Sequence, residues 1–294
     1  MHKRALFLIS FFIAFYTQVC PVAAQLNPLS SQYFINEYLI NPAFAGKEDG
    51  TTLQATYRKQ WSGMPGSPVT QNITADFGLN RVGLGLNVNN ERAGLLRQTR
   101  MLGTYAYHLP LDSGKHQLHF GLSLGMLTQR VEYADMNGDP SDVVVGDYNN
   151  QKNYIDGDFG IAYTSGGLNL QLAIPNMKNF FKRDMRNVSD IVTFYSAVSY
   201  LLDLNEQIAM EPKIAFMGVR NFKNRVDLGM QFEFGGRRFN AAGIYHGNQS
   251  ATFGAGFNFS NKLMLTGLYT TGTSILNNYM NGSFEMNLKF HIND

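Results

Sequence analysis

Oxygen-bearing side chains are most densely spaced between residues 131 and 154. They are Asp135, Asn137, Asp139, Asp142 and Asp147. Carboxylate and amide oxygens are the ligands that Ca²⁺ prefers, so a calcium site is one interpretation of this stretch. A helix-loop-helix calcium loop starting at Asp135 would place Gly sixth and Glu twelfth, but the sequence has Pro140 and Gly146 there. We therefore expect an acidic, solvated loop, with calcium bound through Asp135, Asn137 and Asp139 as the alternative.

The histidines that follow residue 24 do not form a recognisable metal or catalytic motif. They are His108, His116, His119, His246 and His291. His116 and His119 are three residues apart in a stretch that alternates like a β-strand, so their side chains should point to opposite faces and not share a metal ion. No spacing of Ser, His and Asp indicates a nucleophile with its base. The sequence therefore predicts a protein that is not an enzyme and that needs no cofactor.

The first 24 residues have the parts of a secretory signal peptide. Lys3 and Arg4 precede an apolar run from Ala5 to Tyr16, and small residues at 22–24 offer a cleavage site before Gln25. The run is shorter than the ~20 residues of a membrane-spanning helix. Cleavage would remove Cys20, the only cysteine. Lipidation of Cys20 is the rival interpretation, but residues 17–19 lack the usual Leu-small-small pattern. We expect residues 1–24 to direct export by the general secretory route.

Composition limits what the remaining chain can be. No later stretch reaches about 18 consecutive apolar residues, so the sequence predicts no membrane-spanning helix. A formal net charge of +2 argues against nucleic-acid binding, which needs a strongly basic face. The chain has 29 Gly, 22 Phe and 15 Tyr but only 16% charged residues. This balance suits a β protein with small residues on one face of its strands and aromatic residues on the other.

From about residue 51 onward, apolar and polar residues alternate in segments separated by turn residues. In the last segment, Met286, Leu288 and Phe290 alternate with polar or charged residues. A period of two indicates β-strands. Strands are expected at 51–59, 70–78, 81–90, 98–109, 116–130, 155–165, 168–174, 191–203, 207–218, 223–235, 237–247, 250–260, 262–271 and 282–292.

The connections between these strands differ in length in a regular way. Alternate connections are tight turns, whereas the long ones, near 60–69, 131–154, 175–190 and 272–281, all fall on the opposite side. Short periplasmic turns and long outer loops are typical of outer-membrane barrels. We expect residues 51–294 to form an up-and-down antiparallel β-barrel of about fourteen strands in the outer membrane. Tyrosines expected in its interfacial girdles are Tyr105, Tyr107, Tyr163, Tyr195, Tyr200, Tyr245 and Tyr269.

Residues 25–50 precede the expected barrel and are too apolar to remain solvated. A stretch from Ser30 to Tyr38 has the pattern of a short amphipathic helix, and Asn41 and Pro42 then break it. Aromatic and branched residues at this density favour burial over disorder. We expect this N-terminal segment to lie on the periplasmic side or within the lumen, where it would enter or cap the barrel.

Two motifs closely resemble the opening signature of the PorP/SprF family of type IX secretion membrane proteins. Residues 41–46 have the sequence NPAFAG, and residues 57–70 have the sequence YRKQWSGMPGSPVT. Three later stretches are similar to the same family in the expected order: 94–99 (GLLRQT), 105–111 (YAYHLPL) and 172–177 (LAIPNM). The first two motifs are the specific ones, and the resemblance spans nearly all of the chain after residue 24.

The resemblance implies a barrel that works with type IX secretion components and assists the secretion or surface anchoring of a partner, such as a large adhesin used in gliding motility. A passive porin for small solutes is the alternative function. Long loops on a rigid scaffold are where binding residues usually lie. The partner-binding candidates are Arg58, Trp61, Lys178, Phe180, Phe181, Lys182, Arg183 and Arg186. Outer-membrane lipid is the other expected partner, and nucleic acid is not.

Overall fold

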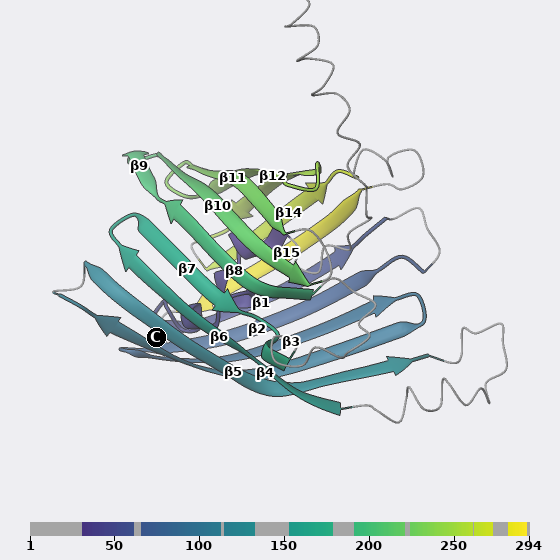
Figure 1. The fold of residues 1–294 in the computed structure, drawn as a ribbon. Coiled ribbons are helices and arrows are strands. Elements are labelled where there is room, and N and C mark those ends of the chain that lie inside the picture. The colour runs from purple at the N-terminus through teal and green to yellow at the C-terminus, as the bar shows by residue number, and fades with distance from the viewer. Residues whose placement is uncertain are drawn as a thin grey trace, which may run out of the picture.

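The computed structural model describes residues 31–61, 66–112, 115–132, 153–178, 191–220, 224–260, 262–272 and 282–292. In this part of the chain the strands form one antiparallel sheet that closes on itself around three short helical turns (Figure 1). No helix among the described residues is long and apolar enough to cross a membrane.

The strands follow the expected ranges to within a few residues. They are β1 (Gly50–Lys59), β2 (Val69–Leu79), β3 (Val82–Ala93), β4 (Leu96–Pro110), β5 (His116–Val131), β6 (Asn153–Ser165), β7 (Leu168–Ile174), β8 (Ile191–Tyr200), β9 (Leu202–Asn205), β10 (Ile208–Arg220), β11 (Arg225–Phe234), β12 (Phe239–His246), β13 (Ala251–Asn258), β14 (Leu263–Thr270) and β15 (Ser283–Ile292).

Strands that are consecutive in the sequence pair with each other, except β8 and β9, and β1 also pairs with β15, which closes the ring. The strands β8 and β9 are separated only by Leu201, and both pair with β10. Together they therefore count as one crossing of the barrel wall from end to end. The described residues therefore form fourteen crossings, which confirms the predicted architecture. Closure matters because lipid offers no hydrogen bonds to a free strand edge.

Along each strand, alternate side chains face the lipid and the lumen. On β5, Leu122 is 44% exposed on the outer surface, whereas Ser123 is 2% exposed and faces inward. Of the girdle tyrosines, Tyr105, Tyr200, Tyr245 and Tyr269 are exposed as expected. The assignment of Tyr195 to the girdle was wrong, because its side chain is fully buried in the lumen. Tyr195 lies on the same face of β8 as the buried Ala197 and Ser199, whereas Phe194 and Val198 on the other face are exposed.

One end of the barrel carries the longer connections, from Lys59 to Val69, Val131 to Asn153, Ile174 to Ile191 and Thr270 to Ser283. We call this the outer end, because long loops of outer-membrane barrels face the cell exterior. The opposite, inner end carries connections such as Leu79 to Val82 and Ser165 to Leu168. Most residues of the three longest loops lie outside the described residues.

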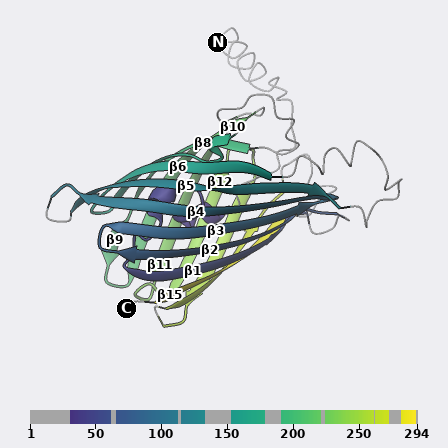
Figure 2. The same ribbon diagram turned by 90° about the horizontal axis from the view of Figure 1, so that it is seen from below.

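Residues 31–49, here called the lumen segment, lie inside the ring of strands (Figures 1 and 2). They form three 3₁₀ turns, η1 (Ser31–Phe34), η2 (Glu37–Leu39) and η3 (Pro42–Phe44), rather than the single helix-like stretch expected from Ser30 to Tyr38. The side chains of Asn36 and Asn41 accept hydrogen bonds from the backbone of η2 and η3. Such local bonds compete with a continuous α-helix.

Candidate functional site

The motif at residues 41–46 fits the inner half of the lumen through backbone contacts. The Asn41 side chain accepts a hydrogen bond from the Ala43 N–H at 3.1 Å. Pro42 packs against Gly121 of β5, where an added Cβ would lie 2.2 Å from the Pro42 carbonyl carbon. Because glycine at position 121 has no side chain, it leaves the room that η3 occupies.

The last residues of the motif are held at the inner end of the barrel. The Gly46 N–H donates to Asp76 Oδ2 at 3.0 Å, and the Ala45 carbonyl lies 3.1 Å from His108 Nε2. Gly46 has a φ of +61°, and a Cβ there would lie 2.5 Å from the Phe77 carbonyl oxygen. Position 46 thus requires glycine for both its conformation and its close approach to β2.

Glu37 ties the middle of the lumen segment to two strands, β7 and β10. Its Oε1 accepts hydrogen bonds from Lys213 at 3.1 Å, Gln171 at 2.6 Å and Asn169 at 2.9 Å. Lys47 Nζ lies 3.7 Å from the other carboxylate oxygen, Oε2. The Glu37 carboxylate therefore forms a charge-assisted link between the segment and the wall.

In the outer half of the lumen, Ser31 and Gln32 contact the carboxylate of Glu285, and Arg58 of β1 contacts it as well. The Ser31 N–H lies 3.3 Å from Glu285 Oε1, and the Gln32 amide donates to Glu285 Oε2 at 3.2 Å. Arg58 Nε lies 3.3 Å from Glu285 Oε1, and both charged side chains are almost completely buried. Since Arg58 and Glu285 are directly paired across β1 and β15, this node joins the lumen segment to the seam of the barrel.

A second cluster at the outer end of the lumen places an acid, an imidazole and a hydroxyl in the same order as the catalytic triad of a hydrolase. Asp227 Oδ2 lies 2.9 Å from His246 Nδ1, and His246 Nε2 lies 2.7 Å from Thr252 Oγ1. However, the Thr252 hydroxyl is 2.8 Å from Ser31 Oγ, and Tyr33 donates to the same Asp227 oxygen at 2.7 Å. With these groups buried under the lumen segment, the network anchors η1 and is closed to a substrate.

Apolar contacts complete the fit of the segment. Tyr33, Phe34 and Ile40 form a buried cluster with residues of β7, β8, β10 and β12 that face the lumen. The cluster's wall residues are Ala173, Val192, Tyr195, Ala197, Ala215, Met217 and Ile244. Exposing such a patch to water would cost about 25 cal/mol per Å² of apolar surface. The segment is thus an integral part of the fold.

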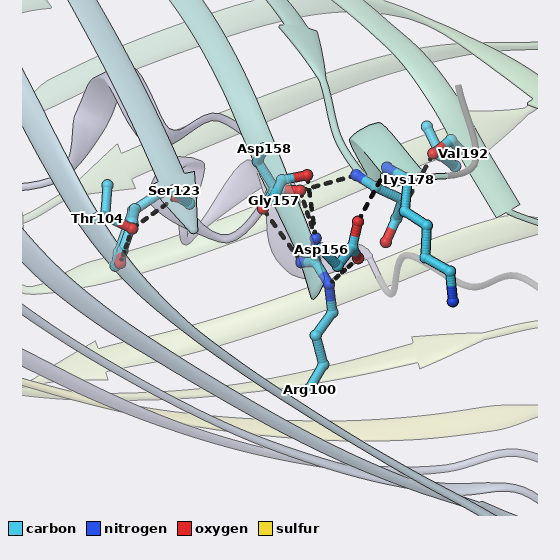
Figure 3. Close-up of polar contacts among 10 residues, drawn as sticks. Arg100, Thr104, Ser123, Asp156, Gly157, Asp158, Lys178 and Val192 are labelled. Atoms are coloured by element: carbon cyan, nitrogen blue, oxygen red, sulfur yellow. Dashed lines mark hydrogen bonds and ion pairs between the residues drawn. The ribbon is translucent and has the colours of Figure 1, made fainter. Parts of the chain in front are cut away.

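A third cluster directs the chain inward after β7 (Figure 3). Arg100 of β4 contacts Asp156 Oδ2 at 2.8 Å and Asp158 Oδ1 at 2.6 Å, both on β6. The same carboxylates accept the backbone N–H groups of Asn176 at 2.8 Å and Lys178 at 3.1 Å. These residues, here called the outer clamp, hold the base of the 175–190 loop against the inner face of the wall.

The structure places only three of the partner-binding candidates. Arg58 is buried in the seam node, Trp61 is half-buried at the start of the β1–β2 loop with a φ of +49°, and Lys178 Nζ lies 3.0 Å from the centroid of the Tyr154 ring. The remaining candidates, Phe180, Phe181, Lys182, Arg183 and Arg186, and the calcium alternative of Asp135, Asn137 and Asp139 lie outside the described residues. Among the described residues, no group of three or more His, Cys, Asp or Glu side chains could hold a metal ion.

Sequence reasoning missed the inward-facing charges that hold the lumen segment and the base of the 175–190 loop. Arg225 contacts Asp227 at 3.0 Å, and the full set on the strands is Arg100, Asp156, Asp158, Lys213, Arg225, Asp227 and Glu285. Their signal in the sequence is a charged residue on the polar side of an alternating strand, mostly near its outer end. That signal gives no pairing, because the partners are far apart along the chain.

Solved structures share this architecture at low sequence identity. The CymD monoaromatic hydrocarbon channel is 10% identical, with a TM-score of 0.52 over 93% of this chain and 95% of that chain. Omp33 of Acinetobacter baumannii is 8% identical, with a TM-score of 0.51 over 84% of this chain and 100% of that chain. These likenesses establish the fold alone. No curated protein matches the sequence.

The family assignment comes from sequence. The profile described as "Type IX secretion system membrane protein PorP/SprF" matches residues 22–290, which includes the lumen segment and every strand but the last residues of β15. The motif at residues 41–46 and its tight fit to the wall lie within this match. The chain is therefore an outer-membrane β-barrel that belongs to the PorP/SprF family of type IX secretion system membrane proteins.

Proposed function

We propose that this barrel is a non-enzymatic scaffold that assists the secretion or surface anchoring of a partner protein, such as a large adhesin, by the type IX machinery. Family membership supports the link to secretion. The observation that carries the proposal is the lumen segment, which fills the barrel with its own residues through both apolar packing and buried polar links. A barrel filled in this way offers a rigid platform for its outer loops.

The same observation disfavours the passive porin. Solute diffusion needs a continuous watery path, but residues 31–46 are buried or half-buried against the wall from the outer to the inner end. One of the spaces beside the segment, lined among others by Asn36, Asp76 and Lys289, has a volume of about 90 Å³, which is room for a few water molecules.

The outer clamp supports a recognition role for the loop that follows it. The two carboxylates fix the backbone of Asn176 and Lys178, so the loop starts from a defined position at the outer end. The basic and aromatic residues between 178 and 186 could then grip an acidic partner surface by charge and by ring burial. Asp135, Asp139, Asp142 and Asp147 in the neighbouring long loop would meet basic residues of the same partner.

Affinity purification of the full-length barrel from native outer membranes tests this proposal. We expect type IX components or one large secreted protein to co-purify, and we expect that secreted protein to disappear from the cell surface when the barrel gene is deleted. A purified barrel that carries only lipid, together with an unchanged set of surface proteins in the deletion strain, would contradict the proposal.

A further inference from the structure

The lumen segment runs through the barrel in one direction. At its start, Ser31 contacts Glu285 close to the first residue of β15 and Thr252 close to the first residue of β13. Both strands begin at the outer end, because they follow outer connections. Ser31 therefore lies at the outer end of the lumen.

The middle and the end of the segment lie progressively closer to the inner end. Asn36 donates to Thr74 at 2.9 Å, and Tyr38 donates to Thr104 at 2.8 Å, both near the centres of their strands. Gly46 then reaches Asp76, close to the inner end of β2. Glu48 lies 3.5 Å from Lys289, near the inner end of β15, and β1 begins at Gly50.

The route back from Ser31 to the inner end is occupied. Phe34 packs so closely on Gly229 that an added Cβ there would lie 2.2 Å from the ring, and Asn41 and Pro42 are equally close to Gly160 and Gly121. A chain that entered from the periplasm and turned at Ser31 would need a second path beside these contacts. Residues 31–46 are buried or half-buried along this whole course, so the described segment takes up the wall positions that a returning chain would use.

We propose that the part of the exported chain upstream of Ser31 lies on the extracellular side of the membrane. The barrel would then present its own N-terminal end at the outer mouth, next to the seam node of Arg58 and Glu285 and the start of the β1–β2 loop. A partner that docks on the outer loops meets this end as an additional contact surface. The inference depends on the direction of the segment and not on the proposed secretion function.

An epitope inserted between Leu26 and Asn27 of the full-length protein tests the sidedness. We expect antibody to label intact cells as strongly as permeabilised cells. The same epitope between Gly166 and Gly167, in the inner β6–β7 turn, should be labelled only after permeabilisation, and an epitope within 273–280 should be labelled on intact cells. If the N-terminal epitope behaves like the one in the inner turn, the inference is wrong.

A smaller change covers the case in which the inserted epitope prevents folding. Asn27→Cys in a Cys20→Ser background adds a single thiol and can be probed on intact cells with a membrane-impermeant maleimide. Labelling before lysis supports an extracellular N-terminal end. Labelling only after lysis, with a matched Thr273→Cys control in the outer β14–β15 connection that reacts on intact cells, overturns it.

Discussion

The guanidinium of Arg58 on the first strand faces the carboxylate of Glu285 on the last strand, with Nε and Oε1 3.3 Å apart at the seam of the barrel. Ser31 and Gln32 bind the same carboxylate from inside. One buried acid therefore connects ring closure with the seating of the lumen segment.

Replacing Glu285 by Ala should destabilise the barrel by roughly 3–5 kcal/mol, because removing one partner of a buried ion pair leaves the other charge poorly compensated. Glu285→Gln keeps the hydrogen-bond acceptor and should cost less. Urea unfolding in detergent, followed by heat-modifiable migration, measures the difference. Asp203→Ala is the matched control, since its ion pair with Arg237 is largely exposed and worth little. Equal losses for Glu285→Ala and Asp203→Ala would show that the seam node carries no special stability.

The wall glycines provide a steric test of the lumen segment. Gly121→Ala places a methyl group where the Pro42 backbone now lies, so we expect a loss of about 1–3 kcal/mol from overpacking. Gly243→Ala on β12 is the control, because nothing lies within 4 Å of its added Cβ. Thermal unfolding of both variants in the same detergent makes the comparison. If the Gly121→Ala protein is as stable as the control, η3 does not pack against Gly121.

Leu122 tests which surface meets lipid. It lies near the middle of β5 and is exposed on the outside, so Leu122→Arg should cost ~2–4 kcal/mol when the barrel folds into bilayers. Phe259→Arg, just beyond the end of β13, should cost only ~0–1 kcal/mol because it lies near the interface. The expected difference vanishes in a protein whose outer surface faces water, and equal penalties would contradict the assigned membrane position.

The sequence was sufficient for the strands, because period-two alternation and one-sided loop lengths are properties of neighbouring residues. It was not sufficient for the inside of the barrel. Arg100 and Asp156 are 56 positions apart in the sequence, and their contact depends on the order and stagger of β4, β5 and β6. Tyr195 illustrates a second limit. Its ring lies on the same face of β8 as the small, buried Ala197 and Ser199, and the alternation of the strand therefore carried its facing, whereas the frequency of tyrosine at membrane interfaces pointed the other way.

The density of aromatic residues predicts that the N-terminal segment enters or caps the lumen, and this is confirmed for residues 31–49. Its path was not predictable, because the segment packs against single glycines that lie on several different strands. The motif at residues 41–46 is recognisable as a family signature from sequence alone, but its physical role is not. The structure gives that role, which is a close fit of backbone to backbone.

We propose that the filled barrel presents an outer loop to a secreted partner. The most direct measurement is surface display of that partner in cells whose barrel has residues 178–186 replaced by a Gly/Ser stretch of the same length. We predict a heat-modifiable, membrane-inserted barrel with the partner lost from the cell surface, whereas replacing residues 112–115 of an inner turn in the same way leaves display intact. Normal display of the partner by cells with the 178–186 replacement would contradict the account.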